Sequence, residues 1–213
     1  MQFDNPCNYI INEEYKMSKI LILFAHPRLE RSRINSGLIR GINKFPGVTF
    51  HDLYEVYPDY DINIKYEQEL VSHHDIIVWH HPFYWYSCPA ITKQWIDLVL
   101  EHNWAYGRNG KALVGKKAFN VITTGGRHEA YQKDGMHKRT IGEFLYPFNQ
   151  TARLCNMTYY PPFVVHKTHL LTHEEINQYR EDYKQVLEIL ADDKMGEEEI
   201  LKLTYLNDIL KKR

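Results

Sequence analysis

The run Lys19-Ile-Leu-Ile-Leu-Phe-Ala25, followed by His26-Pro27, decides the fold. An unbroken apolar run of this length is typical of a strand buried on both faces, as the strands of parallel sheets are. Residues 32–44 then carry apolar side chains at helical spacing and end before Pro46-Gly47, so the strand leads into a helix. Strand followed by helix is the repeating unit of a parallel α/β sheet.

The rest of the chain repeats this alternation. We expect further strands at residues 48–53, 75–79, 117–123 and 159–165, and further helices at residues 65–73, 89–100, 140–155, 172–190 and 196–210. Pro161 and Pro162 place the last strand at a sheet edge, because proline cannot donate to a strand ladder. With five strands, the economical architecture is a doubly wound, flavodoxin-like parallel sheet of order 2-1-3-4-5 with helices on both faces.

Length and charge limit the classes of protein. The chain has 213 residues and a formal net charge of −1, which gives one full domain and no basic field for nucleic acid or anionic lipid. The longest apolar run, residues 20–25, is far too short to insert into a membrane. Three scattered cysteines, Cys7, Cys88 and Cys155, support neither a disulfide framework nor a zinc ribbon, which favours a reducing, cytoplasmic compartment.

Both ends of the chain are expected to lie outside the central domain. Residues 1–18 are interpreted as an N-terminal extension; residues 1–16 are polar and unlike a signal peptide, and Met17 is a second candidate start. Residues 19–190 form the flavodoxin-like domain, and residues 191–213 form a charged helical extension that we expect to pack on its own domain.

Ligands of such a sheet bind at the carboxyl ends of the strands where the strand order reverses. The loops after the first, third and fourth strands are therefore the candidate site. The first of these, residues 26–35, has neither the P-loop nor the dinucleotide glycine pattern, which disfavours ATP and a conventional NAD site. His26 opens it, and Ser32, Arg33, Ile34 and Asn35 lie at a helix start that suits one phosphate group; an ordinary cap at Ser32 is the alternative.

The second loop follows the third strand and is aromatic. Pro82 is followed by four consecutive aromatic residues, Phe83, Tyr84, Trp85 and Tyr86. Their rigid faces and backbone amides suit a planar ring system. The alternative is burial under neighbouring helices or in a dimer contact.

The third loop contains a pair of glycines. It reads Thr123-Thr124-Gly125-Gly126, and Tyr131 and His137 follow. Paired glycines allow the backbone to approach a ligand closely, although most such pairs are merely turns. Backbone N–H groups here could bond the oxygens of a flavin ring, with Tyr131 and His137 stabilising negative charge on it.

Taken together, these stretches resemble the flavodoxin-like NAD(P)H:quinone oxidoreductase family. The resemblance is to the branch of bacterial general-stress NAD(P)H oxidoreductases and ancillary subunits of glutathione-gated potassium efflux systems. The matching stretches are ILILFAHP at 20–27, LYEVYPDYDINI at 53–64, IIVWHHPFYWYSCPAITKQWID at 76–97, WAYG at 104–107, TTGG at 123–126 and YYPPF at 159–163.

The resemblance implies a cofactor and a reaction. FMN, with FAD as the alternative, would contact His26 and residues 32–35 with its phosphate and ribityl parts, and residues 83–86 and 123–126 with its ring. Tyr131 and His137 would be the catalytic pair. The implied activity is ping-pong hydride transfer from NAD(P)H to a quinone or similar acceptor, in a homodimer. The alternative is a regulatory subunit of a potassium antiporter, peripheral to the membrane through that partner.

A metal enzyme is the third hypothesis, because the chain has 12 histidines, including the pairs His73-His74 and His80-His81. Neighbouring residues on a strand point to opposite faces, and no HExxH motif is present, so we expect no metal site. Cys88 lies beside the aromatic loop and could be a redox thiol, but an inert buried thiol is the more economical interpretation.

Overall fold

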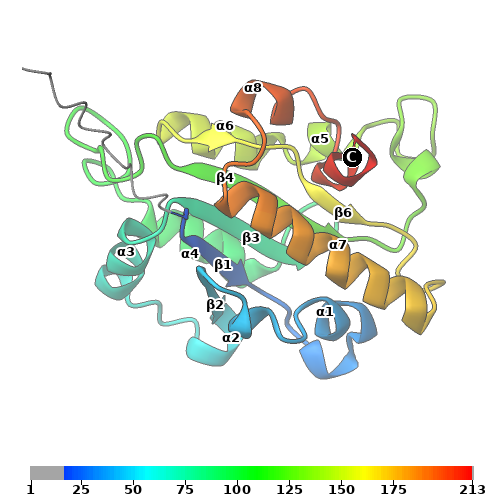
Figure 1. Ribbon diagram of the computed structural model, residues 1–213. Coiled ribbons are helices and arrows are strands. Elements are labelled where there is room, and N and C mark those ends of the chain that lie inside the picture. The colour runs from blue at the N-terminus through cyan, green and yellow to red at the C-terminus, as the bar shows by residue number, and fades with distance from the viewer. Residues whose placement is uncertain (1–16, 213) are drawn as a thin grey trace, which may run out of the picture.

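The computed structural model describes residues 17–212, and Figure 1 shows the arrangement of its elements. The strands are β1 Ile20–Phe24, β2 Val48–Asp52, β3 Ile76–Pro82, β4 Lys117–Thr123, β5 Thr158–Tyr159 and β6 Phe163–Val165. The α-helices are α1 Arg33–Leu38, α2 Leu53–Val56, α3 Ile64–Ser72, α4 Ala90–Val99, α5 Ile141–Phe144, α6 Tyr146–Leu154, α7 His173–Ala191 and α8 Glu197–Ile200. Short 3-10 helices are η1 Leu29–Arg31, η2 Ile42–Lys44, η3 His128–Tyr131 and η4 Leu206–Lys212.

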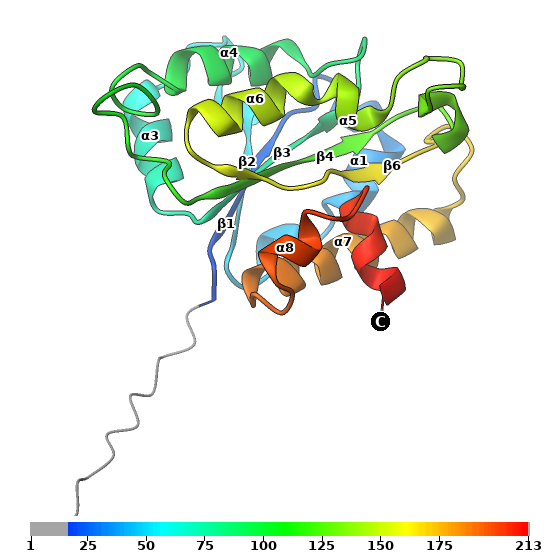
Figure 2. The same ribbon diagram turned by 90° about the horizontal axis from the view of Figure 1, so that it is seen from above.

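The strands form one parallel sheet in the order β2-β1-β3-β4-β5, and β6 pairs with β4 beyond the end of β5. The register aligns Ile22 with Val78 and Val78 with Phe119 across the centre of the sheet. Figure 2 shows α3, α4, α5 and α6 on one face and α1, α7 and α8 on the other. The predicted doubly wound order is confirmed.

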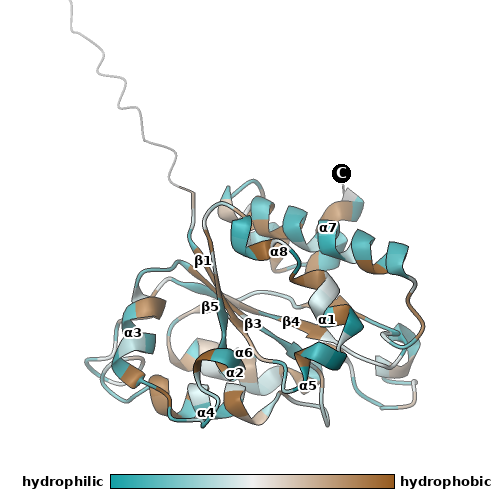
Figure 3. Ribbon diagram, turned by 90° about the horizontal axis from the view of Figure 1, so that it is seen from below, coloured by the Kyte–Doolittle hydropathy of each residue, from teal (hydrophilic) through white to brown (hydrophobic). Residues whose placement is uncertain are grey.

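The two faces of the sheet carry separate hydrophobic clusters. Along β1, Leu21 and Leu23 belong to the cluster under α3, α4 and α6, whereas Ile20 and Ile22 belong to the cluster under α1 and α7. This alternation follows from the two-residue period of a strand, and it explains why β1 is apolar throughout. Figure 3 shows the hydrophobic colour gathered in the strands, while the outer surface of α7 is largely hydrophilic.

One carboxylate is fully buried in the first cluster. Glu67 on α3 has no exposed surface, and it accepts hydrogen bonds from His51 Nε2 at 2.7 Å, Tyr57 Oη at 2.6 Å and Trp95 Nε1 at 2.7 Å. The three donors come from β2, the turn after α2, and α4. The carboxylate therefore ties three segments together at one edge of the sheet.

Three predicted elements are interrupted at a glycine or a proline. The helix expected over residues 32–44 ends at Leu38, and Gly41, with a φ of 75°, separates it from η2. α6 begins at Tyr146 with Pro147 in its first turn, so the helix expected over residues 140–155 becomes α5 and α6. The edge strand expected over residues 159–165 is interrupted at Pro161 and Pro162 and becomes β5 and β6.

The charged helix expected over residues 196–210 is wrong as a single element. The chain forms α8, turns, and continues as η4. Ile200, Leu206 and Ile209 are buried in the cluster under α7, so the segment packs against its own domain. The apolar residues whose spacing predicts one amphipathic helix therefore lie on two short helices, α8 and η4, and both helices contact this cluster.

Residues 1–16 of the expected N-terminal extension lie outside the described residues. Of its last two residues, Ser18 donates its N–H to the Ala191 carbonyl at 2.8 Å, which joins the start of β1 to the end of α7. Among residues 17–212, no helix is long and apolar enough to cross a bilayer.

Candidate functional site

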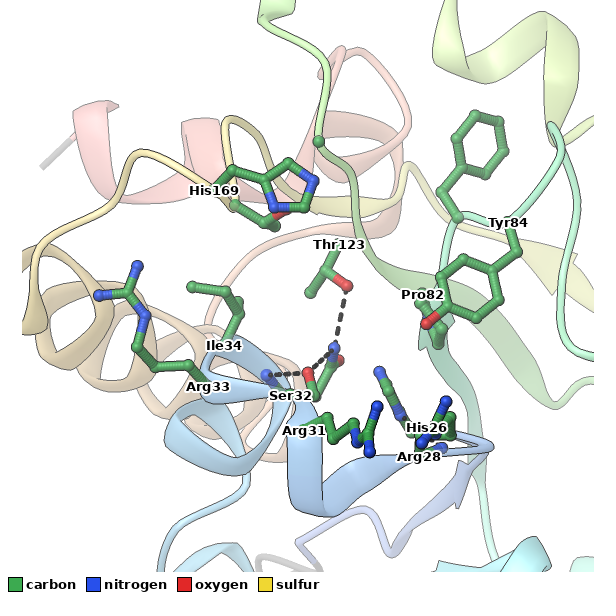
Figure 4. Close-up of a pocket in the computed structure, with 14 residues that line it drawn as sticks. His26, Arg28, Arg31, Ser32, Arg33, Ile34, Pro82, Tyr84, Thr123 and His169 are labelled. Atoms are coloured by element: carbon green, nitrogen blue, oxygen red, sulfur yellow. Dashed lines mark hydrogen bonds between the residues drawn. The ribbon is translucent and has the colours of Figure 1, made fainter.

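A pocket of about 580 Å³ opens at the carboxyl ends of β1, β3 and β4. This is the position where the strand order reverses, since β2 lies to one side of β1 and β3 lies to the other. Figure 4 shows its lining residues, which come from the three loops after these strands and from the loop after β6. The volume falls in the usual range for cofactor and small-molecule sites.

Hydrogen bonds connect three residues that line the pocket, Ser32, Asn35 and Thr123. The Ser32 hydroxyl caps α1 by accepting hydrogen bonds from the Asn35 backbone N–H at 3.2 Å and from Asn35 Nδ2 at 3.0 Å. Asn35 Nδ2 also donates to Thr123 Oγ1 at 3.1 Å, which connects the first loop to the end of β4 (Figure 4). Asn35 Oδ1 is buried and has no partner. The side-chain oxygen of Asn35 is therefore an acceptor on a lining residue that still lacks a donor.

The first loop gives the pocket a positive charge. Arg28 and Arg31 line the pocket, and Arg33 also does, although its Nη2 donates to the Leu171 carbonyl at 2.6 Å. Burial lowers the pKa of His26, so this imidazole is neutral at pH 7, and its Nδ1 accepts the Arg28 N–H at 3.1 Å. The permanent charge therefore comes from guanidinium groups, which suit oxyanions such as phosphate.

The second loop forms a strained turn. Pro82, Phe83 and Tyr84 line the pocket, and the Ser87 N–H donates to the Tyr84 carbonyl at 2.9 Å. Between them, Trp85 and Tyr86 have φ values of 47° and 64°, as a two-residue turn of this hand requires. Bulky side chains adopt this conformation at a cost of about 1–3 kcal/mol each. Trp85 is 93% exposed, so the turn holds its ring out in solvent.

In the third loop, Thr123 and Gly125 line the pocket, and the aromatic residues that follow lie behind the glycines. Tyr131 is 5% exposed, and its hydroxyl lies 2.5 Å from Thr124 Oγ1. A Cβ on Gly126 would lie 2.7 Å from the Tyr131 ring, so a larger residue here would require the ring to shift. The His137 ring stacks on Tyr131 at 4.5 Å between centroids.

The structure therefore gathers most of the predicted binding residues in one pocket. The predicted residues that line it are His26, Ser32, Arg33, Ile34, Asn35, Pro82, Phe83, Tyr84, Thr123 and Gly125. The predicted residues that lie beside it are Trp85, Tyr86, Thr124, Gly126, Tyr131 and His137. Two pairs of these residues beside the pocket interact. The Tyr86 hydroxyl lies 3.4 Å from His137 Nδ1, and the Thr124 and Tyr131 hydroxyl groups form a hydrogen bond.

Sequence reasoning missed four lining residues, Arg28, Arg31, Thr168 and His169. The two arginines lie within the first loop, and their charge beside a phosphate-sized site was a usable signal. Thr168 and His169 follow β6, and they reach the pocket because the Thr168 N–H donates to the Thr124 carbonyl at 3.2 Å. Nothing local in the sequence marks this contact.

The pair His80-His81 is buried inside the sheet, whereas in the other pair His74 is buried and His73 is exposed. Residues 17–212 contain no group of three or more His, Cys, Asp or Glu side chains that could hold a metal ion. Burial lowers the pKa of His80 to about 3 and that of His81 to about 4, and His81 Nε2 accepts a hydrogen bond from Asn120 Nδ2 at 2.9 Å. Burial also raises the pKa of the Cys88 thiol, which is the opposite of what a reactive thiolate needs.

Comparison with known proteins agrees with this geometry. The family model for the flavodoxin-like fold matches residues 18–187. The glutathione-regulated potassium-efflux system ancillary protein KefF of Enterobacter sp. (strain 638) is 42% identical over 168 residues, which cover 79% of this chain and 94% of that protein. Two solved structures are also similar. General stress protein 14 of Treponema denticola, in complex with FMN, is 38% identical with a TM-score of 0.76, covering 81% of this chain and 99% of that one.

The second structure is an NADPH-quinone reductase from P. pentosaceus, 35% identical with a TM-score of 0.72, covering 78% of this chain and 96% of that one. Sequence, sheet order and family match thus agree over the same part of the molecule. The chain belongs to the flavodoxin-like family, in the branch of bacterial quinone reductases and potassium-efflux ancillary proteins that its sequence motifs predict.

Proposed function

We propose that this chain is a flavin-dependent NAD(P)H:quinone oxidoreductase that holds FMN in the pocket at the ends of β1, β3 and β4. The observation that carries the proposal is Asn35 Oδ1, a buried acceptor without a partner on a residue that lines this pocket. A buried polar atom left unpaired costs about 1–3 kcal/mol, so such an atom points to a missing donor. The ribityl hydroxyl groups of FMN are donors of this kind.

The other lining residues fit the remaining parts of FMN. Arg28, Arg31 and the Ser32 hydroxyl suit the phosphate, because guanidinium groups bind oxyanions by charge-assisted hydrogen bonds. The aromatic segment Phe83-Tyr84 and the open backbone at Gly125 suit the edges of the isoalloxazine ring. The similar Treponema protein was solved in complex with FMN, which supports the choice of cofactor.

FMN held in this pocket would supply the redox chemistry, which is the transfer of a hydride from NAD(P)H to a quinone. The residues of this chain bind and orient the reactants and stabilise charge. Tyr131 and His137 stack behind Gly126, where the Tyr131 hydroxyl and the His137 imidazole can stabilise negative charge that develops near the third loop. The similarity to an NADPH-quinone reductase supports this choice of substrates.

The absorbance spectrum of the purified protein, with the mass of any released cofactor, tests the proposal. We expect flavin absorbance and the mass of FMN, and turnover of a quinone with NADH or NADPH. Asn35→Ala should weaken FMN binding about tenfold, which corresponds to about 1.4 kcal/mol. Asn177→Ala, at an exposed position on α7, is the matched control and should bind FMN as the wild type does. A colourless protein that takes up no added FMN refutes the proposal.

We further propose that the chain forms a closed two-fold homodimer with two FMN sites. Trp85 is 93% exposed, Met136 83% and Leu170 62%, and all three lie on loops next to the pocket or to the stacked Tyr131 and His137 rings. Exposed apolar side chains gathered in this way mark protein interfaces. Light scattering at micromolar concentration should give twice the chain mass of 25.4 kDa, and a mass near 25.4 kDa refutes the dimer.

A second candidate function is that of a cytoplasmic ancillary subunit, bound peripherally to a potassium efflux antiporter. The supporting observation is the 42% identity to KefF over 94% of that protein. Co-purification with membranes that contain such an antiporter, and an increase in potassium efflux, would support this role. Wild-type efflux in the absence of the chain would contradict it, whether or not quinone reduction is found.

A further inference from the structure

A second cavity, of about 490 Å³, lies between η3, β6, α7 and the C-terminal segment. Half of its lining residues come from residues 204–211, beyond the part of the chain that the family model matches. Figure 1 shows this end of the chain, in red, beside β6 and α7. The second cavity shares no lining residue with the FMN pocket proposed above. It is therefore a separate feature of the molecule, and nothing in the proposed reaction uses it.

Hydrogen bonds hold the C-terminal segment, which forms one wall of the cavity, against β6 and the residues before it. The Leu206 N–H donates to the Pro162 carbonyl at 2.9 Å. The Asn207 side chain accepts from the Val164 N–H at 2.8 Å and donates to the Val164 carbonyl at 3.1 Å. Leu206 and Ile209 are 0% and 2% exposed. The C-terminal segment is thus a packed part of the domain, and it gives the cavity one fixed wall.

The most unusual residue of the wall is His166. Its side chain lines the cavity and is only 9% exposed. Neither ring nitrogen forms a hydrogen bond of normal geometry, although the Gly126 backbone acts on the ring to raise its pKa against the effect of burial. The ring lies 5.4 Å from the His128 ring and 6.0 Å from the Tyr205 ring, both of which also line the cavity. Burial lowers the pKa of His166 to about 4, so at pH 7 it offers one N–H donor and one nitrogen acceptor.

The remaining lining groups select against charged ligands. Asp208 and Lys211 both line the cavity, but Lys211 Nζ lies 2.7 Å from Asp208 Oδ1, so each charge is already compensated. The rings of Tyr179 and Tyr205 add flat apolar surface with a phenolic hydroxyl at the edge. A wall of aromatic rings with a neutral imidazole fits a flat, uncharged molecule that can both donate and accept one hydrogen bond.

We propose that this cavity is a second binding site, which takes a small uncharged phenol with its ring against Tyr205 and His128 and its hydroxyl on His166. The site lies against the loop that contains Gly126. The Lys167 N–H donates to the Gly126 carbonyl at 3.1 Å, and the His166 ring lies 5.8 Å from the Tyr131 ring. A phenol in this cavity would therefore contact the far side of a segment that borders the FMN pocket.

Calorimetric titration of the full chain with phenol tests the proposal, because it requires neither FMN nor activity. We expect saturable binding of one phenol per chain. His166→Phe keeps a ring and removes both nitrogens, and it should weaken binding at least about tenfold. His73→Phe, which replaces an exposed imidazole on the other face of the sheet, is the matched control and should bind as the wild type does.

Two further measurements keep the test decisive if His166→Phe does not fold. Thr204→Trp, at an exposed position of the lining, should block the cavity without disturbing the core. Benzoate has the same ring with a negative charge, and it should bind more weakly than phenol. Absence of saturable phenol binding, full affinity in His166→Phe or Thr204→Trp, or tighter binding of benzoate than of phenol overturns the proposal.

Discussion

Replacement of Glu67 by leucine gives the largest stability change that we expect from a single side chain outside the pocket. The substitution removes the acceptor of three buried donors, His51 Nε2, Tyr57 Oη and Trp95 Nε1, at 2.6–2.7 Å. A buried donor left without a partner costs about 1–3 kcal/mol, and three such donors lose their acceptor here. Because three losses at one site are not additive, we expect the free energy of unfolding to fall by about 4 kcal/mol.

Urea unfolding at pH 7, followed by circular dichroism, measures this change. Glu67→Gln keeps one oxygen acceptor and nearly the same volume, so it should lose about half as much as the leucine variant. Glu69→Leu, at an exposed position on the same helix, is the control and should change stability by less than about 0.5 kcal/mol. A loss of under about 1 kcal/mol in Glu67→Leu would show that the network contributes little, and would refute this reasoning.

The pH dependence of the same difference gives a second check. Burial acts to raise the pKa of Glu67, but the hydrogen bond and attraction from His51, with the hydrogen bonds from Tyr57 and Trp95, outweigh it and hold the pKa below its ordinary value of 4.5. A carboxylate with a lowered pKa stabilises the fold above its unfolded-state pKa, and this contribution is lost as pH falls through the folded-state pKa. The stability difference between wild type and Glu67→Leu should therefore narrow below pH 4.5, and a constant difference would contradict the assignment.

Three further outcomes follow from single contacts. Thr172→Ala removes the capping box of α7 and should lower the melting temperature by about 2–4 °C, with Thr172→Ser restoring it. Cys155 is 1% exposed and burial raises its pKa to about 11, so a thiol reagent should modify half-buried Cys88 before Cys155, as mass mapping would show. Gly126→Ala places a Cβ 2.7 Å from the Tyr131 ring and should weaken FMN binding about tenfold in a fluorescence titration; unchanged binding would show that Tyr131 can move aside.

The sheet and the position of the pocket were predictable because they depend on local patterns. Five buried apolar runs, each followed by a helix or a loop, predict a parallel sheet whatever the details of packing. The strand order then places the loops after β1, β3 and β4 at one edge, where ten of the predicted residues line the pocket. Periodicity and topology were sufficient for this part.

Other features depend on contacts between distant segments, and no local pattern encodes them. His169 reaches the pocket from the loop after β6 and lies against Gly125, although the two residues are far apart in sequence. The C-terminal segment has helical spacing, but it forms two short pieces, and the Asn207 side chain holds the second piece on β6 by hydrogen bonds to the Val164 backbone. Likewise, the depth of Tyr131 depends on its hydrogen bond to Thr124. Tertiary packing decided these features.

Asn207 also has a consequence for the solubility of shortened chains. Its amide satisfies the N–H and the carbonyl of Val164 on the side of β6 that faces away from β4, as a neighbouring strand would. An unpaired strand edge is a template for pairing with other chains, and proteins that leave one exposed tend to aggregate. Cleavage or truncation before residue 207 would uncover the apolar strand Phe163–Val165 along this edge. Asn207 and the residues around it thus prevent this edge of the sheet from pairing with other chains.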